Sequence, residues 1–176
     1  MRIIAGRWRG RIIEAPPGRK TRPTSDRVRE AWMSAMQLEI PDSKVLDLYA
    51  GSGALGLELL SRGAEHVTFV ERANPALRTL KANAVKLGVT DDEFTLIRGD
   101  AIEYAANLPK LAFDLAVADP PYHQGFAAEL LHLFAQRPFA RWFWVEHATT
   151  ETLPELERLT TRQYGDTALT SIMADA

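Results

Sequence analysis

Four consecutive residues, Asp119, Pro120, Pro121 and Tyr122, follow the apolar run FDLAVA. Two adjacent prolines cannot continue a helix or a central strand, so the pattern indicates a rigid turn at the end of a strand. The carboxylate of Asp119 and the carbonyl of Pro120 are two acceptors that can together hold both N–H groups of a planar amine, and Pro121 stiffens the carbonyl's direction. The ring of Tyr122 offers a face on which an extruded base can stack. The alternative is a rigid turn with a surface tyrosine.

A planar amine is a poor nucleophile because its lone pair is delocalised into the ring. Acceptors on both N–H groups orient that lone pair toward an electrophilic methyl group, and holding the two in line lowers the barrier further. When the methyl leaves a sulfonium, the transition state disperses positive charge, which a nearby carboxylate favours. We expect Asp119 to orient the amine and to take a proton only after transfer. The four histidines lack metal-ligand spacing, so no metal is expected.

A second candidate site is the stretch DLYAGSGALG, in which Gly51, Gly53 and Gly56 form a G-x-G-x-x-G pattern between a strand and a helix. Such glycines let a ligand approach the backbone at a helix N-terminus. Asp47, four residues before the first glycine, suits a cofactor with a cationic amino-acid end better than one with a pyrophosphate. Its alternative role is a local hydrogen bond that holds the turn.

Two further acids follow predicted strands. Glu71 ends HVTFVE, 20 residues after Gly51, where an acid can accept hydrogen bonds from both ribose hydroxyls. Asp100 follows EFTLIRG and can accept from an exocyclic adenine amine, with Ala101 leaving room for the ring; the alternative for Asp100 is a helix N-cap. The predicted cofactor-binding residues are Asp47, Ala50, Gly51, Gly53, Glu71, Arg72, Asp100 and Ala101.

The elements that must position these residues alternate between strands and helices from residue 44 onward. This alternation predicts an α/β fold with a mostly parallel sheet and helices on both faces, in which ligands bind beyond the carboxyl ends of the strands. The last two strands, separated only by a turn, are expected to form an antiparallel hairpin at one edge. Strands are predicted at 44–50, 66–71, 93–100, 113–122, 141–148, 159–165 and 167–174, and helices at 52–63, 74–88, 101–108 and 125–137.

The charge of the 176-residue chain is unevenly distributed. Residues 1–29 contain nine basic and two acidic residues, a net +7, whereas the remaining 12 basic and 21 acidic residues give −9. A basic arm on an acidic body suits a phosphate-rich partner. The absence of cysteine excludes disulfides and thiolate metal sites. No apolar run is long enough to span a bilayer and no signal-peptide core is present, so a cytoplasmic protein is expected.

The basic arm is expected to be ordered. Two Ile-rich runs around Ile3 and Ile13, separated by glycine-bearing residues, predict a β-hairpin, and a helix is predicted over 23–38. Trp8 lies between arginines, a pattern typical of stacking on nucleic-acid bases; a solvated arm is the alternative. The predicted RNA-binding residues are Arg7, Trp8, Arg9, Arg11, Arg22 and Arg27.

At this point a resemblance becomes evident. The segments MRIIAGRWRGRIIEAPPG, RPTSDRVREAWM and LDLYAGSGALGLELLSRGA, together with DPPY, resemble the bacterial 16S rRNA (guanine-966-N2)-methyltransferase family, known as RsmD, over residues 1–125. The resemblance implies a Rossmann-like, seven-stranded class I methyltransferase domain over 23–176 and an RNA-facing N-terminal β-hairpin extension over 1–22. It also implies S-adenosyl-L-methionine as cofactor and methyl transfer to a guanine N2 amine of 16S rRNA. The expected substrate is this rRNA, either naked or within a small-subunit assembly particle, and the expected enzyme is a monomer.

Alternative functions remain open from the sequence alone. One is methylation of another planar amine, such as DNA adenine N6 or a protein glutamine amide, although the glutamine enzymes favour Asn before the two prolines. Another is a non-catalytic nucleic-acid-binding module, against which the intact Asp119 and glycine loop argue. An NAD-dependent oxidoreductase fits poorly because of Asp47 and the lack of an evident proton donor.

Overall fold

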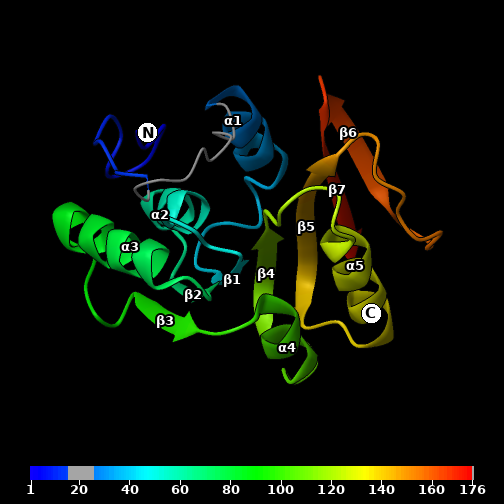
Figure 1. The fold of residues 1–176 in the computed structure, drawn as a ribbon. Helices are drawn as coiled ribbons and strands as arrows, with labels where there is room; N and C mark the ends of the chain where they lie inside the picture. The colour runs from blue at the N-terminus through cyan, green and yellow to red at the C-terminus, as the bar shows by residue number, and fades with distance from the viewer. Residues whose placement is uncertain (16–25, 176) are drawn as a thin grey trace.

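The fold is built on one seven-stranded sheet with strand order β3-β2-β1-β4-β5-β7-β6 (Figure 1). The structure is a computed structural model that describes residues 1–15 and 26–175. Strands β1 to β5 pair in parallel, while β7 pairs antiparallel with both β5 and β6. The mostly parallel sheet and the antiparallel edge hairpin are therefore confirmed. The strands are β1 Lys44–Leu48, β2 His66–Glu71, β3 Phe94–Arg98, β4 Phe113–Ala118, β5 Ala140–Ala148, β6 Thr160–Tyr164 and β7 Thr167–Met173.

Helices cover both faces of this sheet. The helices are α1 Asp26–Ala35, α2 Ala54–Ser61, α3 Asn74–Leu87, α4 Ala101–Ala106 and α5 Phe126–Gln136. Apolar side chains of α1, α2 and α3 form one core against alternate residues of the strands, such as Val45 and Val117. Those of α4 and α5 form the second core against the intervening residues, such as Leu46 and Ala116. This arrangement explains why the central strands are apolar at nearly every position.

The first helix and the N-terminal segment depart from the predictions in part. Helix α1 ends at Ala35, three residues earlier than predicted, and its predicted start at 23–25 lies outside the described residues. No strand forms within residues 1–15; the segment is a closed loop with a single antiparallel bridge, Arg2 to Ile12. The predicted β-hairpin extension is thus not found as such. The proposed boundary at residue 22 also lies outside the described residues.

The N-terminal segment, instead of standing apart as an arm, is part of the first core. Ile3, Trp8 and Ile13 are buried together with residues of α1, α2 and α3. Figure 1 shows the segment, in blue, beside α2 and α3. The amide of Asn83 in α3 holds it at its far end, by accepting from the backbone N–H of Glu14 at 2.9 Å and donating to the Glu14 carbonyl at 2.9 Å.

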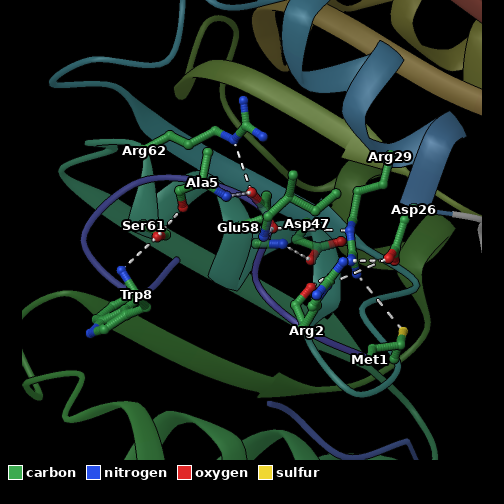
Figure 2. A network of polar contacts seen from close by, with 12 residues as sticks. Met1, Arg2, Ala5, Trp8, Asp26, Arg29, Asp47, Glu58, Ser61 and Arg62 are labelled. Atoms are coloured by element: carbon green, nitrogen blue, oxygen red, sulfur yellow. Dashed lines mark hydrogen bonds and ion pairs between the residues drawn. The ribbon is translucent and has the colours of Figure 1, made fainter. Parts of the chain in front are cut away.

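A buried carboxylate in α2 holds the other end of this segment (Figure 2). Glu58 has no solvent exposure, and it accepts hydrogen bonds from the backbone N–H groups of Ile4 at 2.9 Å and Ala5 at 3.0 Å. Its carboxylate also pairs with Arg62, the residue directly after α2, at 2.9 Å, and lies 4.0 Å from Nε of Arg29 in α1. One side chain therefore joins the N-terminal segment, α1 and α2.

We expect Glu58→Ala to lower the free energy of unfolding by about 3–5 kcal/mol, because it leaves the Arg62 guanidinium and two backbone N–H groups without their acceptor and removes the negative charge beside the buried Arg29. The measurement is urea-induced unfolding followed by circular dichroism. The matched control is Glu65→Ala, at an exposed site of the same charge, which should change stability by no more than about 0.5 kcal/mol. A loss for Glu58→Ala no larger than that of the control would contradict the anchoring role.

Candidate active site

The predicted site residues follow the carboxyl ends of four neighbouring parallel strands. In the register of β1 and β4, Asp47 lies opposite Val117, and Leu48 opposite Ala118, the residue before Asp119. Glu71 is the last residue of β2, and Asp100 follows the end of β3. Because parallel strands end at the same edge of a sheet, these acids gather at one edge, as the sequence predicts.

Asp47 is fully enclosed at this edge. Its side chain is 1% exposed, and Oδ2 accepts a hydrogen bond from the backbone N–H of Gly56 in the first turn of α2, at 3.0 Å. Burial raises the pKa of the Asp47 carboxyl to about 8; the Gly56 hydrogen bond opposes this rise, while the nearby carboxylates of Asp119 and Glu71 add to it. The structure thus shows for Asp47 the local hydrogen bond that the sequence analysis gives as its alternative role.

The glycine loop between β1 and α2 is fixed by Glu71. Its two oxygens accept from the backbone N–H of Gly51 at 2.9 Å and from that of Ala73 at 2.8 Å. Gly51 and Gly53 both have left-handed backbones, with φ of 57° and 87°, which favour glycine. A Cβ at Gly51 would meet nothing within 4 Å, so the loop is open there, whereas one at Gly53 would lie 2.9 Å from Leu80 Cγ.

Asp100 is the N-cap of α4. Its Oδ1 accepts a hydrogen bond from the backbone N–H of Glu103 at 2.9 Å, so the capping alternative is what the structure shows. Asp100 also lines an open hollow of about 540 Å³ together with Arg72, Arg98 and Gly99. Ala101, the first residue of α4, is buried. The hollow lies where β2 and β3 end, the place that the sequence assigns to a nucleoside.

The Asp-Pro-Pro-Tyr turn starts at the end of β4. Asp119 is half-buried, Pro120 is buried and Pro121 is exposed. The hydroxyl of Tyr122 donates to Oε1 of Glu146 in β5 at 2.8 Å and lies 3.0 Å from Oγ1 of Thr167 in β7. The phenol is thus tied to the sheet by its hydroxyl.

Sequence reasoning overlooked Glu146, Glu151 and Thr167 as neighbours of this turn. Glu146 carried a signal, since it is a charged residue inside the apolar strand RWFWVEHA, and the structure leaves it only 1% exposed. An acid in such a place needs hydrogen-bond partners. The other two lie in the C-terminal region, whose residue pattern is not distinctive.

The predicted RNA-binding residues of the N-terminal segment lie at the opposite edge of the sheet. The backbone N–H of Arg7 donates to the carbonyl of Ser61, the last residue of α2, at 2.9 Å, and Nη2 of Arg11 donates to the carbonyl of Lys86 near the end of α3, at 2.7 Å. Helices that follow strands in a parallel sheet end at the amino edge, away from Asp119. Arg7 also pairs with Glu93, directly before β3.

The stacking role predicted for Trp8 is not supported by the structure. The ring is 7% exposed and belongs to the first core, and the guanidinium carbon of Arg7 lies 4.0 Å from its centroid. The backbone N–H of Trp8 donates to Oγ of Ser61 at 3.1 Å (Figure 2). The ring therefore has no open face for a base. Arg9 and Arg27 are exposed, and Arg22 lies outside the described residues.

Two kinds of feature are absent from the described residues: a cluster that could bind a metal ion and a helix that could span a membrane. Within 1–15 and 26–175, no three His, Asp or Glu side chains are grouped so that they could hold a metal ion. In the same part of the chain, no helix is long and apolar enough to cross a membrane.

Comparisons with known proteins agree with this architecture. The sequence model of the family described as Conserved hypothetical protein 95 matches residues 1–173. Ribosomal RNA small subunit methyltransferase D of Haemophilus influenzae is 36% identical over 139 residues, which cover 77% of this chain and 71% of that protein. YlbH of Bacillus subtilis is 36% identical over 160 residues, 88% of this chain and 86% of that protein. The solved structure of yhhF from Escherichia coli has a TM-score of 0.83 and 30% identity, and the match covers 100% of this chain and 98% of that one.

The raised pKa of Asp47 predicts a pH-dependent stability of the cofactor-free protein. The unfolded carboxyl ionises near its ordinary value of 3.8, whereas the folded one keeps its proton to about pH 8. Stability should therefore fall as pH rises between these values, by up to about 1.4 kcal/mol per pH unit from this group. Asp47→Asn, which cannot ionise but keeps an acceptor for the Gly56 N–H, should remove that part of the decline.

The measurement is the free energy of unfolding of wild type and Asp47→Asn at several pH values between about 5 and 8, inside the window between the two pKa values. The difference between the two proteins should shift in favour of the variant as pH rises. Parallel curves would show that Asp47 does not retain its proton in the fold.

Proposed function

This chain belongs to the RsmD/YlbH family of S-adenosylmethionine-dependent rRNA methyltransferases, Conserved hypothetical protein 95, and from that premise we propose that it methylates the exocyclic N2 amine of a guanine in 16S rRNA. The observation that carries the proposal is the position of Asp119. Its carboxylate follows the end of β4, the strand beside β1, and is near enough to Asp47 to raise the pKa of that buried group. The acid of the Asp-Pro-Pro-Tyr turn and the glycine loop thus share one edge.

The residues at this edge fit the cofactor. The space above Gly51 is open, and the hollow beside Arg72 and Asp100 is of nucleoside size or larger. Glu71 uses one lone pair of each oxygen on backbone N–H groups, which leaves further acceptor capacity for ribose hydroxyls. We assign the binding of S-adenosyl-L-methionine to Asp47, Ala50, Gly51, Gly53, Glu71, Arg72, Asp100 and Ala101.

When bound, S-adenosylmethionine supplies an electrophilic methyl carbon on a sulfonium sulfur. The carboxylate of Asp119 and the carbonyl of Pro120 accept hydrogen bonds from the two N–H groups of the guanine amine. These bonds direct the lone pair of the nitrogen out of the ring plane. Pro121 fixes the direction of that carbonyl because its ring restricts the backbone. The ring of Tyr122 supports the flat base. After transfer the nitrogen is acidic, and Asp119 accepts its proton.

The substrate is proposed from the relatives and from the charge of the chain. The relative from Haemophilus influenzae is named for the small ribosomal subunit RNA. Residues 1–29 carry a net +7, and Arg9 and Arg27 are exposed there. We assign phosphate contacts to Arg7, Arg9, Arg11, Arg22 and Arg27, and we expect a monomeric, cytoplasmic enzyme that acts on naked 16S rRNA or on an assembly particle.

The test of the reaction compares Asp119→Ala with Asp119→Asn. Substitution by Ala removes the acceptor and should slow single-turnover methyl transfer by about 10²–10³-fold, whereas Asn keeps an acceptor and should retain much of the rate. The measurement is transfer of a labelled methyl group from S-adenosylmethionine to rRNA from cells that lack the enzyme, followed by mapping of the methylated base.

Two controls accompany this experiment. Both variants should bind S-adenosylmethionine as wild type does, and Asp91→Asn, at an exposed position, should leave the rate unchanged. Equal, near-wild-type rates for the two Asp119 variants would exclude a catalytic role for this residue. A label on a base other than guanine would exclude the proposed substrate.

The proposed RNA contacts are tested by salt dependence. Each phosphate contact that is lost should reduce the slope of log affinity against log salt concentration by about 0.7–0.9. We expect Arg9→Glu and Arg27→Glu to do so with 16S rRNA as ligand, while Arg141→Glu, exposed at the start of β5, serves as the control of equal charge change. Identical slopes for all three proteins and wild type would remove Arg9 and Arg27 from the interface.

A further inference from the structure

Three side chains, from β5, from the turn after β5 and from β7, contact the turn that follows β4. The hydroxyl of Tyr122 donates its one hydrogen to Oε1 of Glu146 at 2.8 Å. The hydroxyl of Thr167, 3.0 Å away, must therefore be the donor in its contact with the phenol oxygen. The phenol thus donates one hydrogen bond and accepts another, and these two contacts fix where its ring lies relative to β5 and β7.

A second carboxylate holds the backbone one residue later. Oε1 of Glu151 accepts from the N–H of His123 at 3.1 Å, and its Oε2 accepts from the N–H of Ala148, the last residue of β5, at 2.7 Å. His123 has a φ of 60°, in the left-handed region, which is unfavourable for a residue with a Cβ. A conformation of this kind persists where its surroundings impose it, and the Glu151 contact is one such constraint.

We propose that Glu146 and Glu151 are positioning residues of the methyltransferase reaction: through Tyr122 and His123 they hold the Asp-Pro-Pro-Tyr turn in the place where Asp119 can orient the amine. This inference rests on the proposed function and deepens it. We call Glu146, Glu151 and Thr167 the clamp. Through these residues β5 and the C-terminal hairpin of β6 and β7 contribute to the active site, although no sequence motif gives these elements a role.

The burial of Glu146 supports a dedicated role. Its side chain is 1% exposed, and a carboxylate in such a place is unfavourable unless it is well hydrogen-bonded. The register supports it too: Ala118, the last residue of β4, lies opposite Val145 in β5, so Asp119 and Glu146, which follow them, lie at the same level along neighbouring strands. A buried acid beside the reacting edge therefore contacts the turn that carries the reacting groups.

The structural part of the inference is tested by hydrogen exchange of the backbone amides of Asp119 and of residues 122–125 in the cofactor-free protein; the two prolines between them have no N–H. Glu146→Ala and Glu151→Ala should speed exchange in this segment, because each removes a hydrogen bond that holds it. Glu155→Ala, an exposed acid that follows the same strand, is the control. Unchanged exchange in both clamp variants would overturn the proposal.

The functional part is tested by single-turnover methyl transfer at saturating cofactor. Glu146→Ala and Tyr122→Phe should each lower the rate about tenfold, the loss typical of one hydrogen bond to a charged group. Affinity for S-adenosylmethionine should stay within about twofold, since the clamp does not touch the glycine loop. Glu146→Gln, which can still accept from the phenol, should restore most of the rate.

A double variant shows whether Glu146 acts through the phenol. If it does, Tyr122→Phe combined with Glu146→Ala should be no slower than the slower single variant. Additive losses, or a wild-type rate in Glu146→Ala, would overturn the proposed route. Tyr122→Phe removes the same hydrogen bond without a cavity, so the test survives if Glu146→Ala does not fold.

Failure of the proposed function has a separate signature. Wild-type protein that transfers no methyl group to 16S rRNA would reject the reaction, whatever the exchange data show. Wild-type protein that is active, with clamp variants that are equally active, would reject the positioning role alone.

Discussion

The carboxylate of Glu58 is the contact on which the arrangement of the N-terminal half depends. It has no solvent exposure, and it meets two backbone N–H groups of the N-terminal segment and the guanidinium of Arg62, with Arg29 close by. A buried carboxylate with fewer partners would be strongly unfavourable. The segments that donate to Glu58 are therefore held where these hydrogen bonds can form. Since α2 begins at the glycine loop, the same contact also fixes the helix that presents this loop to the cofactor.

A second electrostatic constraint operates at the carboxyl edge of the sheet. Asp47, Glu71 and Asp119 lie close enough for the two outer carboxylates to raise the pKa of the enclosed one. The protein tolerates this crowding because backbone N–H groups of Gly51, Ala73 and Gly56 point at the acids. In the cofactor-free protein Asp47 keeps its proton to about pH 8, so the negative charge at this edge lies on the two outer carboxylates. Such charge suits a cationic ligand, which agrees with a sulfonium cofactor.

The strand and helix order could be predicted because hydrophobic periodicity and glycine and proline signals agree along the chain from residue 44 onward. Contacts between residues close in the sequence, such as the N-cap that Asp100 makes on α4, could also be predicted, as alternatives to a ligand-binding role. Contacts between residues distant in the sequence could not be predicted: Trp8 packs in a core formed with α1, α2 and α3, and the hydroxyl of Tyr122 contacts Thr167 in β7. Neither contact leaves a mark in the local sequence, so an arginine-flanked tryptophan looked like a stacking platform when it is a core residue.

The location of Arg7, Arg9 and Arg11 at the amino edge sets a minimum length for any ligand that touches both them and the reacting edge. Helix α2 joins the two edges, and its eight residues span about 12 Å. A polynucleotide strand in a duplex advances about 3.4 Å per nucleotide, so about four nucleotides of duplex span that distance. A free nucleoside can contact only one of the two edges, whereas a folded polynucleotide can contact both at once. The distance between the edges therefore favours polymeric over monomeric ligands.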